Sequence, residues 1–397
     1  MADTNQHTEW LQQFRPLLHY DSRETFRADA PNAITDVEES KGLLGYCNVL
    51  RRGDGTLIAA ADPALYGDRC PKLSLDFLQA TYEDGTSASQ DDYLQEDGPH
   101  PALDAARMHS RPEIADRVCG RVAPDGDRVW LQYWLFFYYN EMFLDDHQGD
   151  WEMVQIALTP EGEPVSATLS AHAHGGTHDY TALEKSKDDP KRCVVYPALG
   201  SHAVYPDSGM HHSGWLDGFD RHDGKGPIVD PELLPLDDSP AAWGGWPGVW
   251  GATRGRIASS PVAPKEQGTR WSDPRKWSIE GEASHHMTLM AEEGTIVVLP
   301  APPLAPKIAA ERDENAIVVH YDAPVSSKGA RAASLLLTLR SADSESLPLT
   351  FTSLVRQEAG ELRLPLPPDD EPRSLEVTAL DVKGQESPQV EVDLTHG

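Results

Sequence analysis

The run from Trp130 to Asn140, WLQYWLFFYYN, constrains the fold of this chain more than any other part of its sequence. Aromatic and branched apolar residues are enriched in β-strands and uncommon in exposed loops. We therefore predict a strand over residues 128–139, in a region that becomes rich in strand signals from Arg117 onward. Polar residues follow this strand and the apolar segments after it, as far as Tyr205. We expect the function of the protein to lie in that stretch.

A hairpin is predicted directly after the aromatic strand. Residues 151–158 alternate between apolar and polar side chains and end at Thr159–Gly162, a sequence typical of a turn. Residues 164–171 then form the partner strand. Because the two strands of a hairpin run antiparallel, the residues that follow 171 return to the start of the first strand.

A long segment, 206–280, is rich in Gly, Pro, Asp and Trp and has weak periodicity. Nine of the ten tryptophans fall between Trp130 and Trp277, which is unusual for a disordered segment. We interpret 206–280 as an ordered excursion that indole rings pack against the rest of the fold.

A boundary between two domains is predicted at the Pro-rich stretch Leu299–Pro303. We assign residues 1–299 to a large metal-binding β-sandwich, 300–306 to a linker and 307–397 to a small β-sandwich. Strand signals in the last part recur every 8–12 residues, which favours a sandwich. The predicted strands there are 315–321, 333–340, 347–355, 361–365, 373–380 and 389–394. This part resembles a fibronectin type III domain at its opening, Pro306–Ile308 with Ile317–Pro324, and at its close, Val377–Ser387.

The formal charge of −30 disfavours binding to nucleic acid or to an anionic membrane through bulk charge. No window approaches the length of a membrane-spanning helix, although peripheral membrane contact stays open. The stretch Met1–Phe14 lacks the basic and apolar regions of a signal peptide, so a cytoplasmic protein is the default, with non-classical export left open. The four scattered cysteines are interpreted as reduced thiols.

The motif His147-x-x-Asp150-x-Glu152 is the first candidate for chemistry. On an extended chain Asp150 and Glu152 point to the same face, and His147 lies in the adjoining Gly-containing turn. Asn140 lies just upstream. Two carboxylates with an amide oxygen favour Mg²⁺ or Ca²⁺, whereas recruitment of several histidines would shift the preference to Zn²⁺ or Mn²⁺. We expect Mg²⁺ or Ca²⁺. The alternative is a polar loop that enters a strand, with no bound metal.

Histidines gather in the same region, since eight of the sixteen fall between His147 and His222. The predicted hairpin brings His172 near Asp150 and Glu152, and His174 follows in the same Gly-rich turn. His202 comes later, in Gly200–Ser201–His202. A Ser/His nucleophile is disfavoured there, because adjacent residues on a strand point apart and no nucleophile elbow surrounds Ser201.

The order HxxDWE, SAHxxGG, VVY and GSHAxYP is similar to that of Vps62-like bacterial and fungal proteins and of the plant DUF946 group. Tyr20–Glu24 and Trp246–Gly251 also resemble recurrent segments of the Vps62 type. More distantly, the chain resembles the necrosis- and ethylene-inducing peptide 1-like proteins, which carry a GHRHDWE heptad. The resemblance covers roughly residues 15–280.

The more distant resemblance implies a β-sandwich related to actinoporins, with a divalent cation that helps to bind a glycosylated sphingolipid headgroup. By position, the ligands to that cation would be His147, Asp150 and Glu152. The upstream acid falls near Asn140, an amide, which departs from the pattern and would weaken the charge of the site. His172 and His202 match the two later histidines. The lack of a signal peptide is a second departure, because these relatives are secreted toxins.

Three hypotheses follow for the function. The first is a recognition protein whose metal-bearing pocket binds a glycan, a glycolipid or another small polar ligand, as in a toxin or a Vps62-like protein. The second is a metal-dependent hydrolase or lyase, with His172 or His202 as the acid or base. The third is a scaffold in which Ca²⁺ stabilises a loop. The residues that we expect to contact a ligand are His174, Trp215, Tyr205 and Asp217.

Overall fold

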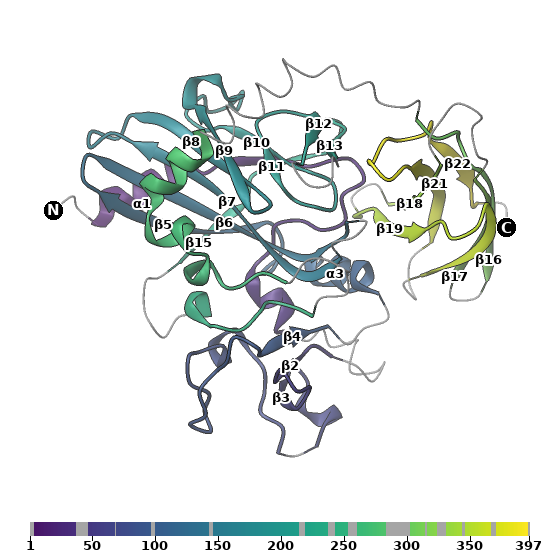
Figure 1. Cartoon of the computed structure of the whole chain (residues 1–397), viewed down its shortest axis with the longest axis horizontal. Helices are drawn as coiled ribbons and strands as arrows, with labels where there is room; N and C mark the ends of the chain where they lie inside the picture. The colour runs from purple at the N-terminus through teal and green to yellow at the C-terminus, as the bar shows by residue number, and fades with distance from the viewer. Residues whose placement is uncertain are drawn as a thin grey trace.

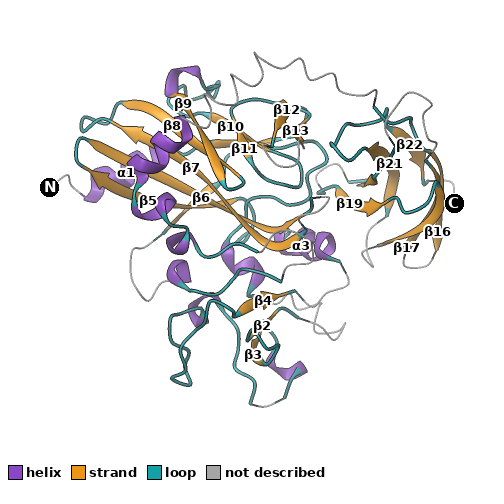
Figure 2. Cartoon of the chain, viewed as in Figure 1, coloured by secondary structure: helices purple, strands orange, loops and turns teal. Residues whose placement is uncertain are grey.

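The chain folds mainly into β-strands, which confirms the predicted fold class (Figures 1 and 2). The computed structural model describes residues 4–36, 47–67, 69–96, 100–142, 146–213, 219–236, 243–252, 260–282, 302–313, 316–323, 331–343, 346–366 and 371–395.

The largest sheet has six strands and contains the aromatic run as one of its central strands. The parallel pair is β15 with β5, and the remaining neighbours are antiparallel. The predicted hairpin is confirmed as β7 and β8, with Val154 opposite Leu169. In sheet order the strands are β15 (Glu232–Pro235), β5 (Arg117–Asp125), β6 (Arg128–Asn140), β7 (His147–Leu158), β8 (Pro164–Ala171) and β9 (His174–Asp179).

One face of this sheet packs against a second, four-stranded sheet, so the first unit of the chain is a β-sandwich. Leu131 and Tyr133 of β6 share a buried cluster with Leu18 and Val195 of the second sheet. Each such fully buried apolar side chain contributes about 1.5–3 kcal/mol. The strands of the second sheet, in order, are β11 (Val204–Tyr205), β10 (Val194–Pro197), β1 (Leu17–His19) and β14 (Ile228–Val229).

The opposite face of the large sheet is covered by tryptophans from the described part of 206–280, as predicted. Trp246 and Trp250 are completely buried, and Trp250 lies edge-on to Trp151 with ring centroids 5.2 Å apart. A β-strand with both faces covered needs apolar residues at nearly every position, which accounts for the composition of β6. Gly149 allows this packing: its φ is +62°, and a Cβ there would lie 2.2 Å from the Trp250 carbonyl oxygen.

The N-terminal third also forms a small three-stranded sheet and several short helices. The acidic, Gly- and Ser-containing sequence of residues 82–104 suggests an exposed loop, but that expectation is wrong, because β4 (Tyr93–Gln95) pairs with β2 (Val49–Arg51) there and α3 (Pro101–His109) follows. Buried Asp92 accepts a hydrogen bond from Tyr82 Oη at 2.7 Å, so an acid in this stretch signalled a buried network. The sheet contains β3 (Leu57–Ala60), β2 (Val49–Arg51) and β4 (Tyr93–Gln95).

The α-helices are α1 (Thr4–Gln13), α3 (Pro101–His109) and α4 (Thr269–Ser272). The 3₁₀ helices are η1 (Pro31–Ile34), η2 (Pro63–Leu65), η3 (Leu75–Phe77), η4 (Tyr180–Ala182), η5 (Trp243–Gly245) and η6 (Pro264–Glu266). A hairpin of β12 (Gly209–His212) and β13 (Phe219–His222) lies apart from these sheets.

The C-terminal unit, which we define as described residues 302–395, contains two further sheets and lies to the right in Figure 1. The six strands predicted there are present, each end within two residues of the predicted one, and β16 was missed. Four of the seven residues of β16 are charged, and most of the strand is exposed, so its sequence carries little strand signal. One sheet contains, in order, β16 (Lys307–Asp313), β17 (Ala316–Asp322) and β20 (Ala359–Pro365). The other contains β19 (Leu349–Leu354), β18 (Ser334–Ser341), β21 (Pro372–Leu380) and β22 (Val390–Asp393). The fibronectin type III assignment and the exact domain limits stay predictions.

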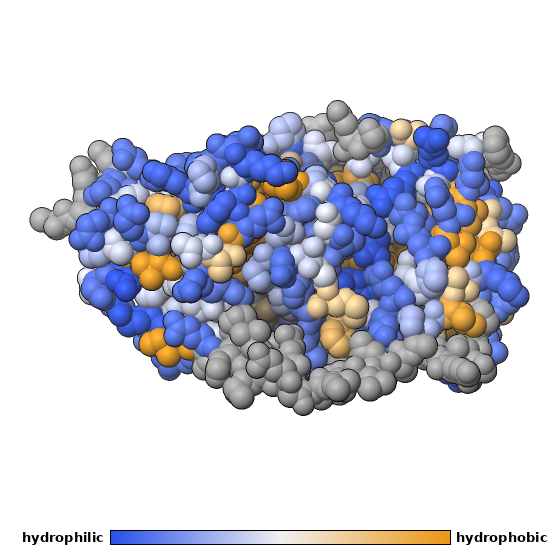
Figure 3. Space-filling model, turned by 90° about the horizontal axis from the view of Figure 1, so that it is seen from above, coloured by the Kyte–Doolittle hydropathy of each residue, from blue (hydrophilic) through white to orange (hydrophobic). Residues whose placement is uncertain are grey.

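Within the described residues, no helix is both long and apolar enough to cross a membrane. The face of the molecule in Figure 3 is mostly hydrophilic, and its apolar residues form small separate groups.

Candidate functional site

A cavity of about 760 Å³ opens at one end of the β-sandwich, and five of the ten predicted site residues line it. Asp150 and Glu152 reach it from β7, as their shared face of the strand predicts. His172 reaches it from the end of β8, where the hairpin returns to the start of β7. Asn140 and His147 lie directly opposite each other on β6 and β7 and also line the cavity.

Asp150 forms the most tightly packed ion pair of the site. Its Oδ2 lies 3.0 Å from His202 Nδ1, and its Oδ1 accepts a hydrogen bond from the Trp151 N–H. The His202 ring stacks on Phe137 with centroids 4.0 Å apart, and the residue has no exposed surface. Burial opposes the charge on both partners, but His147 and His202 outweigh it at Asp150, and Asp150 and Glu24 outweigh it at His202. The pKa of Asp150 therefore lies well below its usual range, and that of His202 rises to about 9.

The pKa of Glu152 is shifted in the opposite direction to that of Asp150, although the two residues are only two positions apart. Burial, and then the charge of Asp150, raise the pKa of Glu152 to about 7. The Ser170 hydroxyl donates a hydrogen bond to its Oε2. Two carboxyl groups on one face of one strand therefore differ, since Asp150 is ionised at neutral pH and Glu152 is about half protonated.

His172 is held by an aspartate that the sequence did not single out. Its Nε2 lies 2.8 Å from Oδ2 of Asp220 on β13. Asp220 also accepts hydrogen bonds from Ser201 Oγ at 2.7 Å and from Tyr205 Oη at 2.6 Å. Burial would lower the pKa of His172, but the charge of Asp220 outweighs burial and raises this pKa to about 9. The raised pKa values of His172 and His202 favour the protonated ring at neutral pH, which suits the acid of the predicted acid-or-base role.

Three side chains at the mouth of the sandwich offer donor types that a divalent cation can use. Asn140 is 3% exposed, and its Oδ1 is buried without a hydrogen-bond partner. His147 Nε2 lies 3.8 Å from Asp150 Oδ1. The amide oxygen and the carboxylate fit Mg²⁺, Ca²⁺ or Mn²⁺ in type, whereas the imidazole is a ligand more typical of Zn²⁺. As the side chains are placed, His147, Asp150 and Glu152 do not bring one donor atom each within 4.8 Å of one another.

The remaining predicted residues fall in different places. His174 is exposed and does not line the cavity. His202 is buried behind Asp150 and does not line it either, which removes His202 from direct contact with a ligand. The Tyr205 hydroxyl donates a hydrogen bond to Asp220, so its link to the cavity runs through that residue. Trp215 and Asp217 lie outside the described residues.

Other residues of the site were missed by sequence reasoning. Asp220 lies among many acids in a Gly-rich segment, and nothing in its sequence context distinguishes it. Arg270 lines the cavity and donates hydrogen bonds to the carbonyl oxygens of His172 and His174. Glu24 lies 3.9 Å from His202 Nε2 and accepts a hydrogen bond from the Gly200 N–H at 2.8 Å. Only Glu24 had a signal, because it ends the recurrent segment Tyr20–Glu24.

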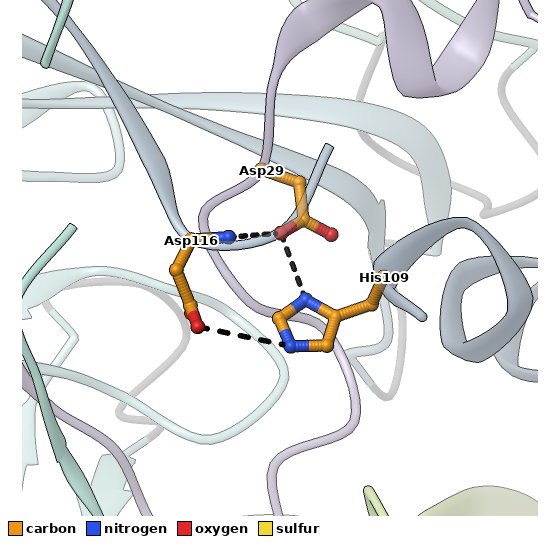
Figure 4. Close-up of side chains that lie close together, drawn as sticks. All are labelled: Asp29, His109 and Asp116. Atoms are coloured by element: carbon orange, nitrogen blue, oxygen red, sulfur yellow. Dashed lines mark hydrogen bonds and ion pairs between the residues drawn. The ribbon is translucent and has the colours of Figure 1, made fainter. Parts of the chain in front are cut away.

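A second group of titratable side chains lies outside this cavity (Figure 4). Asp29, His109 and Asp116 each offer one donor atom within 4.8 Å of the others. However, Asp29 Oδ1 faces His109 Nδ1 at 2.8 Å, whereas Asp116 Oδ2 faces Nε2 at 3.9 Å. The two carboxylates are therefore on different edges of one ring, which is the arrangement of a protonated histidine between two acids.

Comparisons with known proteins give matches to solved structures alone, all at low identity. No protein-family model matches the chain, and no curated protein is similar to it in sequence. Similar solved structures are toxin-fold proteins of the necrosis-inducing group. One is NLPPya in complex with glucosamine, at 15% identity and a TM-score of 0.21, covering 30% of this chain. The chain spans 50% of the length of NLPPya.

Two further matches cover more of the chain. A structure described as a toxin fold for microbial attack and plant defense is 12% identical, with a TM-score of 0.31, and the match covers 70% of this chain and 92% of that one. Necrosis and ethylene inducing protein 2, from the causal agent of witches' broom disease of cocoa, is 10% identical with a TM-score of 0.26. Its match covers 72% of this chain and 88% of that one. At these TM-scores the functional argument rests on the cavity itself.

Proposed function

We propose that the cavity is a recognition site for a glycan or a similar small polyhydroxylated headgroup. The observation that carries the proposal is the convergence of polar side chains from four strands and turns on one cavity of about 760 Å³. That volume is within the range of small-molecule sites. Hydroxyl-rich ligands need many donors and acceptors at fixed positions, and the network around Asp150, His172 and Asp220 holds its members in place.

A divalent cation, Mg²⁺ or Ca²⁺, would be held by Asn140, His147 and Asp150, with Glu152 close by. The buried, unpartnered Oδ1 of Asn140 supports this assignment, because an unsatisfied buried acceptor costs about 1–3 kcal/mol unless something occupies it. When bound, the cation would supply positive charge, and a hydroxyl or phosphate group of the ligand could coordinate the cation. The protein's own groups then orient the rest of the ligand.

Isothermal titration calorimetry with Mg²⁺ and Ca²⁺, followed by glucosamine and mannosamine, tests the proposal. Wild-type protein should bind a cation, and Asn140→Asp should bind it more tightly, because a charge replaces an amide. Asn140→Ala should bind it more weakly. Lys187→Gln, at an exposed position away from the cavity, is the matched control. If wild type and Asn140→Asp bind neither cation nor amino sugar, the proposal is wrong.

A second candidate, a hydrolase or lyase acting on a glycan or phosphoester, is favoured by one observation. His172 lines the cavity, and a carboxylate orients its ring, as in many acid–base pairs. Assays of product formation on glycoside and phosphodiester panels would decide. Turnover that His172→Gln abolishes without loss of ligand binding supports an enzyme. Ligand binding without turnover in the wild type leaves recognition as the function.

A further inference from the structure

The C-terminal unit lines the same cavity. Beside the residues of the β-sandwich, the lining includes Ser334, Leu336, Thr352 and the turn 380–384. A C-terminal unit that only extends the chain would act as a spacer. These residues instead line the candidate site together with residues of the β-sandwich. The question is therefore what they offer to a ligand.

Ser334 offers an unused hydrogen-bonding group. It begins β18, is 1% exposed, and its Oγ has no hydrogen-bond partner. Asn140, on the β-sandwich, likewise has a buried Oδ1 without a hydrogen-bond partner, and this residue lines the same cavity. Buried polar groups are satisfied in more than nine cases of ten, so two unsatisfied groups that face one cavity from two units indicate a shared polar ligand.

Lys383 offers an unused charge. Among the described residues it has no ion-pair partner, although it is half-buried and lines the cavity. Its turn is rigid, because Asp381 Oδ1 accepts hydrogen bonds from the N–H groups of Lys383 and Gln385, each at 2.8 Å. Asp381 is thus engaged by N–H groups of its own turn and forms no ion pair with the lysine.

The turn is also fixed against the β-sandwich. Glu386 Oε1 accepts hydrogen bonds from Arg23 at 2.9 Å and from Arg221 at 2.8 Å. Arg221 is the neighbour of Asp220, which holds His172, and it also donates to the Gly384 carbonyl oxygen. Gly384 has a φ of +82°, a left-handed conformation that favours glycine at this turn.

We propose that the binding site is completed by the C-terminal unit, and that its ligand is a polyhydroxylated molecule with an anionic substituent. Ser334 hydrogen-bonds the ligand, and Lys383 pairs with the anionic group. Glu386, bonded to Arg23 and Arg221, keeps the turn in register with His172 and Asp220. This inference rests on the proposed recognition function, and it adds the second wall and the charge of the ligand.

Calorimetry on the full chain, with saturating Mg²⁺ or Ca²⁺, tests the inference with three probes: glucosamine, glucosamine 6-phosphate and inorganic phosphate. Wild type should prefer glucosamine 6-phosphate to both of the others. Lys383→Gln should weaken glucosamine 6-phosphate about tenfold, as expected for one lost charge pair, and leave glucosamine within about twofold. Ser334→Ala should weaken both sugars several-fold. Lys187→Gln should change nothing.

The outcomes separate the two proposals. If the sugars bind and Asn140→Ala weakens them, while Lys383→Gln and Ser334→Ala do not, the two-unit site is wrong and the proposed function stands. If inorganic phosphate binds as tightly as the phosphorylated sugar, Lys383 belongs to a simple anion site and the inference is also wrong. If no probe binds to the wild type, both proposals fail. Circular dichroism of each variant confirms that it is folded.

Discussion

The molecule contains two groups of histidine and carboxylate side chains, and their differences show how a binding site differs from a structural network. In the first group, Asp29 and Asp116 flank His109, and the Asp116 N–H also donates to Asp29 Oδ1 at 2.9 Å. That group joins three segments, namely the chain before η1, the end of α3 and the start of β5. In the second group, around the cavity, the pairs are equally short, but they support side chains that face open volume.

Proximity of donor atoms is therefore a poor criterion for a site in this protein. The group with three donor atoms within 4.8 Å has its carboxylates on different ring nitrogens and does not line the cavity of about 760 Å³. The cavity group has its donors farther apart, yet it leaves Asn140 Oδ1 and Ser334 Oγ unsatisfied. Asp116 Oδ1 of the first group is also unsatisfied, so the two groups differ because Asn140 and Ser334 line the cavity. Variants in the two groups should therefore behave differently.

The largest effect is expected from Asp150→Ala. It removes one partner of a fully buried ion pair and leaves the protonated His202 without its main counter-charge. Loss of one partner of such a pair costs about 3–5 kcal/mol. Urea unfolding followed by tryptophan fluorescence should show this loss. In a double-mutant cycle, adding His202→Ala should cost much less than it does in the wild type. Additive losses would show that the pair contributes little.

A smaller loss of stability is expected from His109→Gln, with no effect on ligand binding. Burial lowers the pKa of His109, but the hydrogen bond to Asp29 and its charge outweigh burial and raise it above 6.5. The folded state then binds the proton more tightly than the unfolded state. The contribution, roughly 1.5–3 kcal/mol, is present below pH 6.5 and is lost as the pH rises through the folded pKa.

Unfolding free energies of wild type and His109→Gln, measured from pH 6 to pH 9, check this dependence. The difference between the two proteins should shrink as the pH rises. A difference that grows with pH would mean that His109 is neutral in the folded state. Weaker cation or sugar binding in His109→Gln would contradict the division into a structural group and a binding group.

Local rules predicted the part of the site that is close in sequence. The shared face of Asp150 and Glu152 follows from the alternation of a strand, and the return of His172 follows from the hairpin. The same rules failed at His174, because His172 has φ +55° and the chain reverses there, so that His174 turns outward. No local rule could select Asp220 or Ser334. Both reach the cavity through contacts between segments far apart in the sequence, and neither stands in a distinctive motif.

The smallest change in stability, and the sharpest contrast with His109→Gln, is expected from Asn140→Ala and Ser334→Ala. Each removes a buried polar atom that has no partner, so the relief of about 1–3 kcal/mol offsets the small space left behind. The unfolding free energy should stay within about 1 kcal/mol of wild type or rise, while the affinity for cation or sugar falls. Such residues are retained at a cost to stability, which is expected where function requires them. A loss of more than about 2 kcal/mol in either variant would show that its polar atom is satisfied within the protein, for example through a buried water. In that case the contrast between the two groups would no longer hold at that residue.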